Sequence, residues 1–110
     1  MKGTVIKITS RGEISKEEIT SPPSLKFLQS SVGGFIESVP FFGKVVLGED
    51  QSLRCRAFCN EEGKIRGLPY NEKATHLWYE SMGETYESYP DILVGDVVII
   101  CGDEELLDQL

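Results

Sequence analysis

The chain has 110 residues, of which 40% are hydrophobic and 26% are charged, and 11 basic against 18 acidic side chains give a net charge of −7. This length suits a single domain over residues 1–110 with one modest core. The negative charge disfavours binding to bulk nucleic acid, because phosphate backbones attract basic surfaces. The longest apolar run, Val97–Cys101, is too short to span a bilayer, and the amino terminus lacks the apolar block of a signal peptide. We therefore expect a cytoplasmic protein.

The amino-terminal third predicts a hairpin followed by a helix. Residues 4–9 have strand composition, Gly12 supplies a turn, and residues 13–20 return as a second strand. Two prolines then break the chain, and apolar residues recur at helical spacing over 25–32. The glycine pair at 33–34 suits a left-handed helix cap.

The middle of the chain predicts three strands. Residues 35–39 alternate into a strand, which Pro40 ends or places at a sheet edge. Residues 44–47 and 52–59 form two further strands around a hairpin loop at 48–51.

The cysteines predict neither a disulfide nor a metal site. Cys55 and Cys59 share one face of the expected strand, where their Cα atoms would stand roughly 13 Å apart. This distance excludes a disulfide and a shared zinc ion, so we interpret them and Cys101 as buried, reduced thiols. We expect no cofactor and no bound metal.

The carboxyl-terminal half predicts a second helix and the last strands. Asn71 is a good N-cap for a helix over 72–82, whose apolar residues recur at helical spacing. A polar loop follows over 83–91, and residues 92–94 and 96–101 indicate the last strand or strands.

These elements together predict an α+β fold. The two helices lie among strands at hairpin spacing, without the regular strand–helix alternation of a parallel sheet. We expect a mostly antiparallel sheet of about five to seven strands packed by two helices. Asp103 begins either a short C-terminal docking helix or a frayed end.

Three segments occur in a fixed order: SVGGFIESVP at 31–40, CNEEGKIRGLPYN at 59–71 and ILVGDVVIICG at 92–102. Their order and spacing resemble a family of small uncharacterised domains of phages, plasmids and other mobile elements, over most of the chain. The resemblance implies an α+β domain of mobile-element origin and no activity that could be transferred to residues. The chain departs from the family pattern in its long 72–91 segment and its short carboxyl end.

Catalysis finds little support in the sequence. No nucleophile motif, P-loop or dinucleotide fingerprint is present. Glu72, the single histidine His76 and Glu80 are spaced four apart along one helix face. That spacing fits a weak metal site of a metal-dependent hydrolase, or the commoner solvated charged stripe. We expect the protein not to be an enzyme.

A basic cluster between residues 54 and 66 is the main candidate site. Same-face arginines two residues apart stand about 7 Å from one another, within reach of one phosphate. A short strand expected at 64–66 leads into a glycine–proline corner and the electropositive start of the second helix. Alternatively, the cations pair with nearby acids and the corner is only a link. The candidate ligand-binding residues are Arg54, Arg56, Lys64, Arg66, Gly67, Tyr70 and Asn71.

Aromatic residues in loops offer a second candidate surface. Phe41 and Phe42 follow Pro40 outside the expected strand, and Tyr86 and Tyr89 flank the polar loop. Such side chains anchor partner proteins or a second copy of the chain, or they fold back into the core.

The leading hypothesis is a small, non-enzymatic phage or mobile-element protein that sequesters a nucleotide-like anionic host signal, an anti-defence activity. The alternative is an interaction module that occludes a host or phage protein through its acidic and aromatic surface. The metal-dependent hydrolase is a third interpretation.

Overall fold

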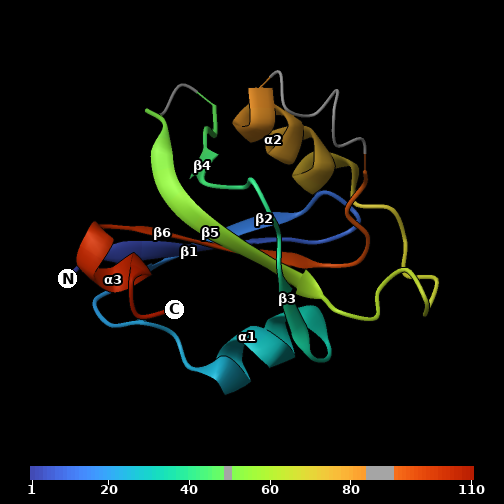
Figure 1. Cartoon of the computed structure of the whole chain (residues 1–110), viewed down its shortest axis with the longest axis horizontal. Helices are drawn as coiled ribbons and strands as arrows, with labels where there is room; N and C mark the ends of the chain where they lie inside the picture. Colours follow the sequence, from blue (N-terminus) through green and yellow to red (C-terminus); the bar gives the residue numbers. More distant parts are fainter. Residues whose placement is uncertain (49–50, 84–90) are drawn as a thin grey trace.

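The computed structural model describes residues 1–48, 51–83 and 91–110, and its centre is an antiparallel sheet (Figure 1). Its six strands are β1 (Gly3–Ile8), β2 (Ile14–Ile19), β3 (Ile36–Ser38), β4 (Lys44–Val45), β5 (Leu53–Asn60) and β6 (Val97–Gly102). The strand order is β2-β1-β6-β5-β3, and β4 pairs with β5 outside this path. The helices are α1 (Leu25–Val32), α2 (Glu72–Met82) and α3 (Glu104–Leu107).

The sheet has a helical layer on each face. Helix α2 covers one face, and α1 and α3 lie against the other (Figure 1). Along β6, Val97 and Ile99 pack toward α2, whereas Val98 and Ile100 pack toward α1 and α3. Because both faces are covered, this central strand is apolar at successive positions instead of alternating. The predicted α+β fold is confirmed, including the short C-terminal helix.

The helix ends carry local caps, of which Gly33 and Asn71 were predicted from the sequence and Ser24 was not. The Ser24 side chain accepts a hydrogen bond from Phe27 N–H at the start of α1, and Gly33 ends this helix with φ 75°. The Asn71 side chain caps α2 in the same way. These local signals decide where each helix starts and stops.

Two predicted strands are wrong. Residues 64–66 lie in a turn, in which Arg66 N–H donates to Glu62 O and Leu68 N–H donates to Gly63 O, both at 2.9 Å. The turn satisfies these backbone groups locally, so no strand partner is needed. With other described residues, 92–94 form one isolated bridge, between Val94 and Tyr70.

The three cysteines are free thiols, as the sequence predicts. Cys55 and Cys101 are buried and directly opposite each other on β5 and β6, and Cys59 is partly buried. A hydrogen bond with the Cys101 thiol, together with burial, raises the pKa of Cys55. In the described part of the chain, no helix has the length and apolar character needed to cross a membrane.

Candidate functional site: two hollows beside helix α2

The structure does not gather the predicted basic cluster at one place. Arg54 and Arg56 share a shallow depression with the acidic Glu104 and Asp108, beside α3. Lys64 follows the opposite end of β5, and the six residue steps from Arg54 to the end of this strand span roughly 20 Å. One phosphate cannot reach both groups.

The remaining members of the cluster have structural surroundings of their own. Lys64 forms an ion pair with Asp91. The Arg66 guanidinium lies against Gly34, just beyond the carboxyl end of α1, where the helix dipole favours a cation. Gly67 adopts φ 67° in the turn, and open space surrounds the position of a Cβ, so the turn conformation explains this glycine.

Asn71 is a buried structural residue, which corrects its prediction as a ligand contact. Its side chain is 0% exposed. The amide nitrogen donates to Ile8 O at 3.0 Å and to Gly95 O at 2.8 Å, and the amide oxygen accepts from Ala74 N–H at 3.0 Å. Every polar atom of the side chain is thus engaged inside the protein.

The predicted aromatic anchors divide between surface and core. Phe41 is 57% exposed and has a positive φ of 62°. Phe42 is 3% exposed and belongs to the core under α2, so its prediction as a partner anchor is wrong. Tyr86 and Tyr89 lie outside the described residues.

The first hollow, called the basic hollow below, has a volume of about 550 Å³. This volume lies within the range of ligand sites, about 300–1,000 Å³. Its lining residues are Ser10, Arg11, Gly12, Tyr70, Glu72, Lys73, His76 and Tyr79. Two permanent cations, one titratable histidine and two phenol rings therefore face one carboxylate.

Long-range hydrogen bonds fix the two walls of the basic hollow. The β1–β2 turn is held because Ser10 N–H donates to the Asp96 carboxylate at 3.1 Å. The opposite wall, the start of α2, is held to β1 by the bond from Asn71 to Ile8 O. Arg11 is thereby brought beside Lys73, although the two are far apart in the sequence.

The predicted Glu72–His76–Glu80 stripe is present on α2. His76 Nε2 lies 3.1 Å from Glu80 Oε1, and both side chains are well exposed. Glu72 and His76 line the basic hollow. Within the described ranges, no group of three or more histidine, cysteine, aspartate or glutamate side chains has a metal-binding arrangement.

The second hollow, called the acidic hollow below, lies beside β3 and has a volume of about 230 Å³. Its walls include the apolar side chains of Val39, Trp78 and Leu93. Its charged lining residues are Glu37, Glu61, Lys64 and Asp91. Three carboxylates thus face one ammonium group.

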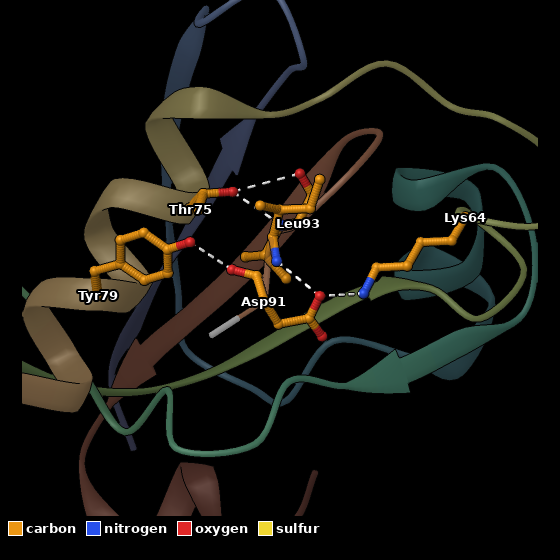
Figure 2. A network of polar contacts seen from close by, with 6 residues as sticks. Lys64, Thr75, Tyr79, Asp91 and Leu93 are labelled. Atoms are coloured by element: carbon orange, nitrogen blue, oxygen red, sulfur yellow. Dashed lines mark hydrogen bonds and ion pairs between the residues drawn. The ribbon is translucent and has the colours of Figure 1, made fainter. Parts of the chain in front are cut away.

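A polar network joins the acidic hollow to α2, as Figure 2 shows. The Tyr79 hydroxyl donates to the Asp91 carbonyl at 2.5 Å, and the Thr75 hydroxyl accepts from Leu93 N–H at 2.9 Å. The Asp91 carboxylate accepts from Ile92 N–H at 2.7 Å and from the Lys64 ammonium. Since Tyr79 lines the basic hollow and Asp91 the acidic one, the two hollows share a wall.

Two pKa values in the acidic hollow are shifted. Burial raises the pKa of Asp91, but hydrogen bonds from Lys64 and Ile92 lower it by more, so it lies below its ordinary value. Burial first, and then the charge of Glu37, raise the pKa of Cys59 to about 11. The Cys59 thiol is therefore protonated at neutral pH and is a weak nucleophile.

Sequence reasoning missed Arg11, Lys73 and Glu37 as site residues. Arg11 sits in a hairpin turn, where charged residues are ordinary, and only the tertiary contact with α2 gives it a role. For Glu37, the sequence offered one clue. Pro40 indicated that the strand before it lies at a sheet edge, where side chains border open surface.

The fold and site define an α+β domain with a doubly covered antiparallel sheet and two oppositely charged hollows beside one helix. A family model described as "Domain of unknown function (DUF3846)" matches residues 1–109, and the chain belongs to this family. The expected membership of an uncharacterised family is confirmed, whereas the mobile-element origin stays a prediction. Comparisons with curated proteins and with solved structures give no match.

Proposed function

We propose that this protein is a non-enzymatic binding protein that holds a small anionic ligand with an aromatic ring, such as a nucleotide, in the basic hollow. The supporting observation is local charge. In a chain of net charge −7, one hollow is lined by Arg11, Lys73 and His76 together with two tyrosine rings. Guanidinium and ammonium groups bind phosphate through charge-assisted hydrogen bonds.

The tyrosines supply the second half of the recognition. Tyr70 is 49% exposed, so its ring is available to stack on a base. Stacking of a base on an aromatic side chain contributes about 1–3 kcal/mol. Glu72 opposes an anion at the same place, so the ligand's phosphates are expected beside Arg11 and Lys73, and its ring beside Tyr70.

Sequestration by such a protein is stoichiometric. Its effect would depend on affinity and on the amount of protein, because no turnover follows binding. This is the form in which a phage or mobile-element protein would remove a nucleotide signal of its host.

Thermal unfolding with a panel of adenine and guanine mono-, di- and cyclic nucleotides tests the proposal. A nucleotide at 100 times its Kd stabilises the folded state by about 2.7 kcal/mol. For a domain of this size, that raises Tm by on the order of 10 °C. Mass spectrometry of ligands released from heat-denatured protein is the second arm.

Two charge-matched double variants make the test specific. Arg11→Gln with Lys73→Gln is expected to abolish the nucleotide shift, because both phosphate-binding cations are removed. Arg54→Gln with Arg56→Gln removes the same charge beside α3 and is expected to preserve the shift. No shift with any nucleotide, or its loss only in the second double variant, would contradict the proposal.

The alternative function, an interaction module, keeps one of its aromatic residues at the surface. Phe41 is more than half exposed and lies in a turn beside α2. Replacement by serine is expected to weaken partner binding if this surface is used, and to leave nucleotide binding unchanged.

A further inference from the structure

The open edge of β3 is the first part of a second candidate site, independent of the basic hollow. Strand β3 is last in the sheet and pairs only with β5 among the described residues. Val39 N–H donates to Ala57 O, and Phe35 O accepts from Glu61 N–H, both at 2.9 Å. Since alternate residues of an antiparallel strand bond to the same neighbour, the N–H and C=O groups of Ile36 and Ser38 point away from β5.

The acidic hollow adjoins this edge and carries excess negative charge. Lys64 is engaged by Asp91. Neither Glu37 nor Glu61 forms an ion pair with another described residue. Glu37 lies on β3 and Glu61 directly follows β5, and both line the hollow, so their charges stand beside the open edge.

Apolar side chains line the acidic hollow, some of them buried and others exposed. Inside, Trp78 is 1% exposed and Leu93 is 5% exposed. Ile65, which lines the hollow, is 87% exposed, and Phe35, just before β3, is 65% exposed. Apolar walls with carboxylates at the mouth complement a lysine or arginine side chain, which has an aliphatic stem and a cationic head.

We propose that β3 and the acidic hollow dock an extended segment of a partner protein, which adds to the sheet edge and inserts one lysine or arginine side chain. Backbone hydrogen bonds to Ile36 and Ser38 supply affinity, and the hollow supplies the preference for a cation. The opposite edge strand lacks this combination. It carries Lys16, Glu17 and Glu18, a mixture of charges typical of edges protected against pairing.

Four synthetic peptides test the docking site by fluorescence anisotropy. Each is N-acetylated and C-amidated, with the sequence Ser-Val-Thr-X-Thr-Val-Ser and a fluorophore on an added terminal glycine. X is lysine, norleucine or glutamate, and the fourth peptide is the lysine peptide with both threonine nitrogens methylated. These two nitrogens flank X and face Ser38 and Ile36 when the peptide adds antiparallel to β3. The lysine peptide is expected to bind at least tenfold more tightly than the norleucine and N-methylated peptides, and the glutamate peptide is expected not to bind.

Two variants separate the contributions of charge and edge. Glu37→Gln is expected to weaken the lysine peptide severalfold and leave the norleucine peptide unchanged. Ser38→Pro removes an outward N–H from an edge strand, where proline is tolerated, and is expected to weaken both peptides equally. Glu17→Gln on β2 is the charge-matched control and is expected to change neither. Circular dichroism verifies folding, and the N-methylated peptide tests the edge without any variant.

Several results would overturn the proposal. Equal binding of the lysine, norleucine and glutamate peptides would show that the hollow does not select a cation. Equal binding of the N-methylated peptide, or full competition by putrescine at equal concentration, would show a small-cation site without strand addition. The Arg11→Gln with Lys73→Gln variant is expected to bind the lysine peptide normally, so failure here and failure of nucleotide binding are distinguishable.

Discussion

The two hollows beside α2 differ in sign although they share a wall. The basic hollow collects Arg11, Lys73 and His76, whereas the acidic hollow collects three carboxylates and one engaged lysine. Among the described residues, Tyr79 of the basic hollow and Asp91 of the acidic hollow meet in a hydrogen bond between them. A net charge of −7 therefore does not describe what any one part of this surface attracts.

The difference arises from which segments the fold brings together. The basic hollow joins the β1–β2 turn to the start of α2, and the acidic hollow joins β3 to the turn after β5. Asn71 and Tyr79 fix the boundary between them. Substitutions at this boundary are expected to affect stability and both hollows, whereas substitutions of lining charges are expected to affect one hollow only.

Asn71→Ala is expected to have the largest effect, because it damages the start of the shared helix. It removes a helix cap and leaves the buried carbonyls of Ile8 and Gly95 without their donor. The expected loss in the free energy of unfolding is roughly 3 kcal/mol, measured by urea denaturation. Ser24→Ala removes only a cap, from α1, and should cost about 1 kcal/mol. Equal losses would contradict the structural role of Asn71.

Tyr79→Phe removes the hydrogen bond that joins the two hollows. The variant loses the hydrogen bond to Asp91 O but keeps the ring that lines the basic hollow. The expected loss is about 1 kcal/mol in the free energy of unfolding, and a weaker affinity for the lysine peptide. Tyr70→Phe removes a hydroxyl with no hydrogen bond to another described residue and serves as the control. A wild-type stability for Tyr79→Phe would show that the wall does not depend on this bond.

Lys64→Met tests the ion pair of the acidic hollow through the pH dependence of the free energy of unfolding. Both partners of the Lys64–Asp91 pair are partly exposed, so the expected loss at pH 7 is only about 0.5 kcal/mol. The pKa of Asp91 is lowered in the folded state, so the pair stabilises the fold above about pH 4. This stabilisation disappears as the pH falls through the folded-state pKa. Urea denaturation between pH 7 and pH 2 should show the variant and wild type converging in acid; a constant difference would contradict the account.

The smallest expected effect concerns the Cys59 thiol in the acidic hollow. With a pKa of about 11, it should react with iodoacetamide at pH 7.5 roughly two orders of magnitude more slowly than free cysteine. Glu37→Gln removes the smaller of the two main causes, so the rate should rise only about twofold. Mass spectrometry of the alkylated peptide follows the rate. A rate in wild type equal to that of free cysteine would contradict a partly buried thiol beside Glu37.

The sequence predicts the fold better than the site, for a physical reason. Helix α2 follows from neighbouring residues, since its cap and its apolar spacing are local signals. The strand predicted at 64–66 is wrong because three residues are too few to show that hydrogen bonds within a turn satisfy their backbone groups. The site depends on tertiary contacts, such as Asn71 with Ile8, which place Arg11 beside Lys73. Adjacency in sequence instead pointed to Arg54 and Arg66, which the extended strand holds apart.

One measurement tests the central claim of two oppositely charged hollows most directly. A single ¹⁵N-labelled sample is titrated first with the tightest nucleotide of the panel and then with the lysine peptide, and amide shifts are mapped by NMR. The nucleotide is predicted to shift the amide signals of Arg11, Tyr70 and Lys73. The peptide is predicted to shift the amide signals of Glu37 and Ser38. Shifts from both ligands at one hollow, or nucleotide shifts centred on β5 beside α3, would contradict it.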